Sequence, residues 1–273
     1  MLEKYLVRIR CPICGTIIKL CSRQGTQFYI CPECYLCFRK DVLSTNPVIL
    51  WEGDYYTNEQ IIKHHMLRNS AFRNIERIIY SSLGRRGKIL DVGCGVGTFL
   101  EIAKQREWQV EGVEPSPTAA KVAQLRTGAQ IYQEDFLTLD YIGHFDAITI
   151  FDVLRTIPDP KQFIQKVFDM IKPSGVCVIR ETNAWYGRTR REKSSMQKKI
   201  QEYMQEWTPI SIEKALLKIG FSNVQIYPSP VFIDGNENRI YRLLKPLPYI
   251  IFKWVHLVSA RVISPNMIAI ARK

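Results

Sequence analysis

The stretch "KILDVGCGVGTFL" at residues 88–100 decides the fold. Its apolar start predicts a buried strand, and the continuation "TFLEIAKQ" predicts an amphipathic helix. An acidic residue, Asp91, closes the strand, and Gly93, Gly95 and Gly97 follow at alternate positions. The glycines therefore occupy a strand-to-helix turn, where α/β folds hold a nucleotide-like ligand over a helix N-terminus.

Strand and helix patterns alternate through the rest of the 273-residue chain. Ser116-Pro117, Asp159-Pro160 and Thr208-Pro209 each predict a helix start, with a capping side chain before a proline at the first helical position. The alternation predicts an α/β fold, Rossmann-like, with a seven-stranded, mostly parallel sheet and helices on both faces. After the first strand, further strands are expected at 109–114, 129–136, 145–154, 175–183, 223–228 and 267–273.

Acidic residues mark the ends of the first two strands. Asp91 precedes the first glycine by two residues, and Glu114 ends the second strand about 20 residues beyond that glycine. Thr98 stands where a dinucleotide fingerprint would place its third glycine. This arrangement resembles motif I of class I S-adenosylmethionine-dependent methyltransferases, and the resemblance covers residues 89–273.

The resemblance implies S-adenosylmethionine as cofactor and assigns roles to further strand ends. In the family an acidic residue after the third strand bonds the adenine amino group and the next residue packs on the ring. The matching positions here are Asp135 and Phe136, and Asp152 lies at the ligand-facing end of the fourth strand. The full set of expected cofactor-binding residues is Asp91, Gly93, Gly95, Gly97, Glu114, Asp135, Phe136 and Asp152.

In detail the chain looks most like methyltransferases acting on small molecules, sugars and quinone precursors. Those often read "DVLEHIPDP" after the fourth strand, whereas this chain reads "DVLRTIPDP". Arg155 and Thr156 replace the family's Glu-His pair. A mechanism that places a histidine base at this point therefore fails for this protein.

Two C-x2-C pairs, Cys11/Cys14 and Cys31/Cys34, lie 16 residues apart near the N-terminus. This spacing is typical of a structural zinc ribbon, expected over residues 1–43, with iron as the competing metal. Cys21 and Cys37 are expected to be ordinary thiols, and either is an alternative ligand. Because the first ten residues are charged, no signal peptide is expected. The sequence contains no apolar run of about 20 residues, so no membrane span is expected. We therefore expect a reducing, cytoplasmic location.

Two segments offer groups for the methyl acceptor. Residues 44–84 are expected to form a lid or linker helix, and residues 180–199 leave the carboxyl edge of the sheet with a basic run. The catalytic domain is expected over 85–273. The candidate catalytic residues are Tyr56, His64, His65, Asn183 and Tyr186; the aromatic residues Tyr55 and Trp185 accompany them.

A helical insertion is expected before the last strand, at residues 231–264. On a helical projection Ile251 and Trp254 share an apolar face, and His256 lies on the other side. One interpretation is a covering helix packed on the core. The other is an interfacial helix, residues 247–263, in peripheral contact with a membrane that holds a lipid-linked substrate.

The net charge of +12 favours anionic partners. The leading hypothesis is in-line transfer of a methyl group to a small or carrier-linked metabolite, at oxygen or carbon. The first alternative is a ribosomal RNA base methyltransferase that binds RNA through the zinc ribbon and the basic run. The second is a non-catalytic cofactor-binding subunit.

Overall fold

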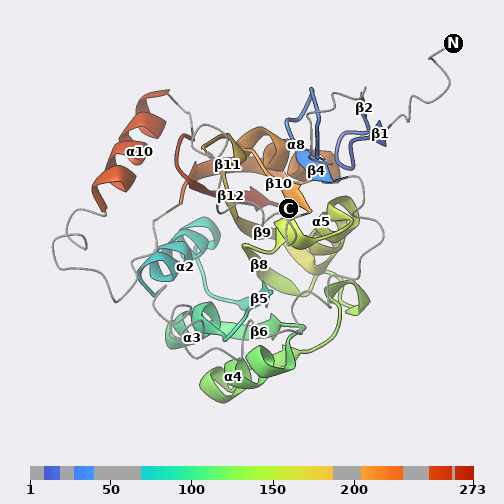
Figure 1. Cartoon of the computed structure of the whole chain (residues 1–273). Coiled ribbons are helices and arrows are strands. Elements are labelled where there is room, and N and C mark those ends of the chain that lie inside the picture. Colours follow the sequence, from blue (N-terminus) through green and yellow to red (C-terminus); the bar gives the residue numbers. More distant parts are fainter. Residues whose placement is uncertain (1–8, 19–27, 40–68, 187–203, 230–245, 260–261) are drawn as a thin grey trace, which may run out of the picture.

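The computed structural model describes residues 9–18, 28–39, 69–186, 204–229, 246–259 and 262–273 (Figure 1). Several predicted features lie outside these residues: Cys21, Tyr55, Tyr56, His64, His65 and the basic run at 188–199.

A seven-stranded sheet forms the centre of the molecule, with strand order β11-β12-β9-β8-β5-β6-β7. The strands from β5 to β9 run parallel, and β12 lies antiparallel between β9 and β11. The predicted Rossmann-like, mostly parallel sheet is thus confirmed. The strands are β5 Lys88–Val92, β6 Gln109–Val113, β7 Gln130–Tyr132, β8 Phe145–Phe151, β9 Ile171–Thr182, β11 Ser222–Pro228 and β12 Asn266–Arg272.

Helices cover both faces of this sheet, as Figure 1 shows. On one face, α2 (Asn69–Leu83) and α3 (Thr98–Gln105) pack Phe72 and Phe99 against each other and against Phe151 of β8. On the other face lie α5 (Pro160–Met170) and α8 (Pro209–Ile219), while α4 (Pro117–Thr127) packs beside α3 and β7. The described part of the expected lid segment, α2, is therefore a helix packed on the sheet.

The helix starts follow the sequence signals. Ser116 accepts a hydrogen bond from the Ala119 amide at the start of α4, and Thr208 forms a capping box with Ser211 at the start of α8. Each cap satisfies backbone N–H groups that have no partner within the helix. Two short 3₁₀ turns, η3 (Phe136–Thr138) and η4 (Leu154–Thr156), follow the carboxyl ends of β7 and β8.

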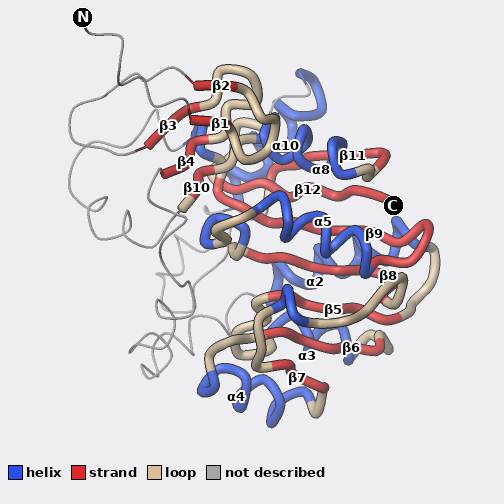
Figure 2. The backbone as a smooth tube through the Cα atoms, turned by 90° about the vertical axis from the view of Figure 1, so that its right-hand side faces the viewer, coloured by secondary structure: helices blue, strands red, loops and turns tan. Residues whose placement is uncertain are grey.

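The cysteine-rich N-terminus forms two hairpins that join the domain built on the seven-stranded sheet. Strand β1 (Ile9–Arg10) pairs with β2 (Ile17–Ile18), and β3 (Phe28–Ile30) pairs with β4 (Cys37–Arg39). A strand from later in the chain, β10 (Gln205–Glu206), extends the second hairpin into a three-stranded sheet (Figure 2). Among the core residues, Leu36 and Phe38 belong to the same buried cluster as Trp207.

Helix α10 (Pro246–Ser259) corrects the expected orientation of the insertion. Ile251 and Trp254, which the covering-helix interpretation places toward the core, are 59% and 67% exposed. His256, predicted on the opposite side, is half-buried with its ring against Tyr227 of β11. The apolar face in the sequence could not indicate which side of α10 packs on the core, because both sides of this helix carry large apolar residues. Among the described residues no helix is long and apolar enough to cross a membrane.

Candidate active site and metal centre

The glycine loop between β5 and α3 has a backbone conformation that is unfavourable for residues with a Cβ atom. Gly93, Gly95 and Gly97 have φ angles of 74°, 53° and 76°, in the left-handed region. A Cβ atom built on Gly93 would lie 2.3 Å from a methyl carbon of Val153, in the turn after β8. The loop therefore needs glycine for its turn and for its close contact with the next strand end.

Asp91 and Glu114 stand at the carboxyl ends of β5 and β6, and both are buried. Asp91 accepts a hydrogen bond from the Thr149 hydroxyl at 2.7 Å. Glu114 accepts from the backbone N–H groups of Gly95 at 2.8 Å and Ser116 at 3.0 Å. The Glu114 carboxylate thus links the glycine loop to the start of α4.

Burial raises the pKa of both carboxyl groups to about 7. The Thr149 hydrogen bond opposes this rise at Asp91, and repulsion from Glu114 adds to it. Among the described residues neither carboxylate forms an ion pair. Two buried acids of this kind suit a ligand that brings a positive charge and hydroxyl donors.

Asp135 and Phe136 begin the 3₁₀ turn η3 at the next strand end. Asp135 is exposed and accepts a hydrogen bond from the Leu137 amide at 2.9 Å. Phe136 is buried, with its ring centre 4.8 Å from that of Phe163 on α5. The structure therefore places both at the edge of the sheet where the glycine loop lies, with Phe136 anchored in the core.

Asp152 lies at the end of β8 in a left-handed conformation, with a φ angle of 64°. Two buried guanidinium groups, from Arg155 on η4 and Arg180 on β9, bind its carboxylate. Arg155 also pairs with the buried Glu181 at 3.0 Å, and Arg180 donates to the Ser229 hydroxyl at 3.1 Å. Among these residues only Asp152 was expected at the site from the sequence. The signal for the cluster was the Arg-Glu pair inside an otherwise apolar strand.

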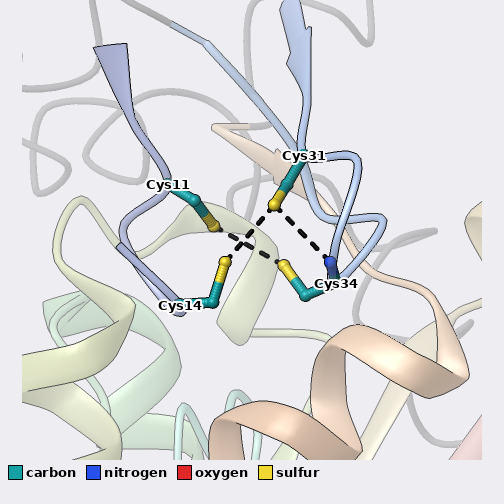
Figure 3. A group of neighbouring side chains, drawn as sticks. All are labelled: Cys11, Cys14, Cys31 and Cys34. Carbon is teal, nitrogen blue, oxygen red and sulfur yellow. Dashed lines mark hydrogen bonds between the residues drawn. The ribbon is translucent and has the colours of Figure 1, made fainter. Parts of the chain in front are cut away.

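The cysteines at 11, 14, 31 and 34 converge as predicted, with their sulfur atoms all within 4.8 Å of one another (Figure 3). A tetrahedral zinc site with zinc–sulfur bonds of about 2.3 Å requires sulfur atoms about 3.8 Å apart. A hydrogen bond with Cys34 lowers the pKa of Cys11 to about 5, whereas burial raises the pKa of Cys31. The donor set fits a metal ion, because a cation would stabilise all four thiolates together. Cys37 is buried on β4, outside this cluster.

The comparison with known families agrees with this geometry. A family profile described as a methyltransferase domain matches residues 62–226, more than half of the chain. The chain belongs to this methyltransferase family. The resemblance to S-adenosylmethionine-dependent methyltransferases and the enzyme class are thereby confirmed.

Individual relatives share less with this methyltransferase. A ubiquinone biosynthesis O-methyltransferase of Psychrobacter arcticus is 26% identical over 169 residues, which cover 54% of this chain and 63% of that protein. One from Chromobacterium violaceum is 34% identical over 95 residues, or 32% of this chain and 41% of that protein. The chain thus spans less than two thirds of these relatives.

Solved structures share the fold of the methyltransferase. Phosphoethanolamine N-methyltransferase 2 of Haemonchus contortus superposes with a TM-score of 0.57 at 17% identity, over 84% of this chain and 61% of that one. A methyltransferase from Archaeoglobus fulgidus gives 0.53 at 16% identity, over 82% and 99%. At these identities the likeness extends to the fold alone.

The described acceptor-side candidates of the methyltransferase follow β9. Asn183 is buried, and its amide group donates to the Val262 carbonyl and accepts from the Trp185 amide. Tyr186 is half-buried, with its ring edge against Phe252 of α10. Asn183 therefore fixes the chain where it leaves β9, and Tyr186 contacts α10.

Proposed function

We propose that this methyltransferase transfers the methyl group of S-adenosylmethionine to a small or carrier-linked metabolite, at an oxygen or carbon atom. The observation that carries the proposal is the pair Asp91 and Glu114, buried on either side of a glycine loop whose amide binds Glu114. The relatives named ubiquinone biosynthesis O-methyltransferase support an oxygen acceptor on a small molecule.

In this proposal Asp91 binds the ammonium group of the cofactor, and Glu114 accepts hydrogen bonds from the ribose hydroxyls. Each carboxylate oxygen accepts more than one hydrogen bond, so Glu114 keeps capacity beyond its two backbone donors. Asp135 and Phe136 take the adenine, and Asp152 lies beside the site. The glycine loop, Gly93 to Gly97, lets the ligand approach the backbone over the N-terminus of α3.

The bound cofactor supplies a methyl group already activated on a positively charged sulfur. The chain then has to align the acceptor with that methyl group and exclude water. Thr156 takes the position where the similar methyltransferases carry histidine, so a proton from the acceptor must leave by another group. Tyr56, His64, His65 and Tyr186 stay candidates for this role; Asn183 is better suited to position Trp185.

We also propose that the four-cysteine cluster holds a structural zinc ion. Four thiolates would complete its coordination, which leaves no open position for a substrate. A hairpin module of this size has too small a core to fold without such a ligand. Metal analysis of the purified protein tests this assignment, and one bound iron in place of zinc would contradict it.

Two further contacts stay proposals. Ile251, Trp254 and Leu257 of α10 are exposed beside Lys253, a pattern that favours peripheral contact with a membrane surface. The RNA alternative uses the zinc ribbon together with the basic run at 188–199, and that run lies outside the described residues.

Calorimetry and a labelled-methyl survey test the proposed function. We expect the protein to bind S-adenosylmethionine and to label a low-molecular-mass or lipid fraction of a cell extract. Absence of binding at millimolar cofactor would refute the proposal. Label confined to RNA would support the RNA alternative, and binding without any labelled product would support the non-catalytic subunit.

A further inference from the structure

Strand β10 lies between the four-cysteine module and the turn η4, which follows β8. On one side it pairs antiparallel with β4, placing Gln205 opposite Phe38 and Glu206 opposite Cys37. The backbone N–H of Arg39 extends this pairing by donating to the Met204 carbonyl at 3.0 Å. The second cysteine hairpin is therefore bonded to the catalytic domain through backbone groups.

On its other side the same segment bonds the turn that follows β8. The backbone N–H of Met204 donates to the Arg155 carbonyl at 2.8 Å. The side-chain amide of Gln205, which is buried, donates to the Ile157 carbonyl at 2.7 Å. The middle of η4 and the residue that follows it are thus held by residues adjoining the metal module.

The turn η4 reaches the proposed cofactor site by two routes. Arg155 binds the Asp152 carboxylate and pairs with Glu181. Val153 fills the space that a side chain on Gly93 would need. A shift of η4 therefore moves both the left-handed Asp152 and the surface on which the glycine loop packs.

Helix α8 adds a second connection, directly to the metal-binding turns. Lys214 donates to the Glu33 carbonyl at 2.7 Å, and Lys218 donates to the Cys14 carbonyl at 3.0 Å. Each of the two Cys-x2-Cys turns is thus capped by a lysine from the catalytic domain. These contacts place the hairpins in one defined position against the domain.

We propose that β10 couples metal binding at the four cysteines to cofactor binding at the glycine loop, with Gln205 and Arg155 as positioning residues. Without a metal ion the small module cannot hold β4 in place. Strand β10 then loses its partner, and η4 loses the support on which Val153 and Asp152 depend. The inference rests on the proposed zinc site and on the proposed cofactor.

Because binding free energies are linked, the coupling must be reciprocal. Calorimetry should show S-adenosylmethionine binding to the zinc-loaded protein at least about fivefold more tightly than to the zinc-free protein, within the usual range of such couplings. Competition with a chelator should show zinc binding tightened by the same factor when S-adenosylmethionine is present. Equal cofactor affinity with and without zinc would overturn the proposal.

The variant Gln205→Ala tests the path itself with zinc still bound. We expect this variant to keep its full zinc content and to lose cofactor affinity by about threefold or more. S-adenosylmethionine should also tighten zinc binding less in this variant than in the wild type. Gln165→Ala removes an exposed glutamine from α5 and should keep the full coupling. Val167→Ala, a buried substitution on the same helix, should lower stability without changing the coupling.

These arms separate the possible failures. If the zinc-free chain unfolds globally, the zinc-loaded Gln205→Ala protein still tests the proposed coupling through β10. Unchanged cofactor affinity in that variant would overturn the proposal. If neither the wild type nor any variant binds S-adenosylmethionine, the proposed function itself fails. No acceptor is needed in any arm.

Discussion

The backbone N–H of Gly95 donates a hydrogen bond to the Glu114 carboxylate at 2.8 Å. This bond joins the glycine loop after β5 to the end of the neighbouring parallel strand. The same carboxylate accepts from Ser116, so one buried side chain fixes both the loop and the start of α4. We expect this carboxylate to shape the cofactor site and to bind the cofactor.

Glu114→Gln is expected to weaken S-adenosylmethionine binding by about 10- to 100-fold. The glutamine amide keeps the size of the side chain but removes its negative charge. Its NH₂ group also replaces one carboxylate oxygen, so a side-chain donor faces the backbone N–H of Gly95 or Ser116. Calorimetry measures the effect. Glu107→Gln, at a side chain that is 86% exposed, serves as the matched control. Equal affinity in both variants would contradict the assigned role of Glu114.

Cofactor affinity should rise as the pH increases from 6 to 8. Asp91 and Glu114 have pKa values of about 7 in the folded protein, and the cationic ligand prefers their ionised forms. Calorimetry across this range in constant ionic strength checks the rise. Affinity that is constant between pH 6 and 8 would show that neither carboxylate titrates with ligand binding.

Stability of the ligand-free protein should show the opposite trend. The folded pKa of Asp91 lies above the unfolded value of 3.8, so the folded state binds the proton more tightly. The free energy of unfolding therefore falls as the pH rises from about 4 to 7, by up to a few kcal/mol. Asp91→Asn should raise the melting temperature at pH 8 while abolishing cofactor binding. A lower melting temperature for this variant would contradict the prediction.

Gly93→Ala is expected to destabilise the protein by about 2–4 kcal/mol and to weaken cofactor binding. The new methyl group combines a left-handed φ with a clash against Val153. Gly143→Ala shares the positive φ, 55°, but its added Cβ meets nothing within 4 Å, so about 1 kcal/mol is expected. Denaturant unfolding compares the two.

A second substitution separates the clash from the backbone strain. Val153→Ala should restore part of the stability lost in Gly93→Ala, because it removes the methyl group that the new Cβ meets. A strictly additive double variant would show that the two positions do not contact each other.

Arg180→Met is expected to lower the free energy of unfolding by about 3–5 kcal/mol. The substitution removes the Arg180 guanidinium from the Asp152 carboxylate, while the guanidinium of Arg155 stays in place. Asp152 must still adopt its left-handed backbone conformation, now without the ion pair to Arg180 that helps to fix it. Adding Asp152→Asn should recover part of the loss. A double-variant cycle in urea measures the interaction, and a coupling energy near zero would rule out this role for the pair.

Much of the fold and of the candidate cofactor site could be predicted because the signals are local. Alternation of apolar strands and amphipathic helices, with proline and glycine at the helix ends, gave the elements and their order. Parallel strands place their carboxyl ends at one edge, so Asp91 and Glu114 had to lie near the glycine loop. The spacing of the cysteines likewise predicted their convergence.

Other parts of the site were less predictable because they depend on contacts between distant segments. Nothing local in "MQEW" at residues 204–207 indicates that it pairs with a cysteine hairpin near the N-terminus. The four charges of Asp152, Arg155, Arg180 and Glu181 become one cluster only when β8 and β9 lie side by side.

The sequence by itself determined the Rossmann-like sheet, the family and the glycine loop, since each follows from backbone preferences within a few residues. Only the tertiary structure decided which side of α10 faces outward and how the metal module joins the turn beside Gly93. These depend on which surfaces remain to be covered once the whole chain has packed, and a local pattern does not contain that information.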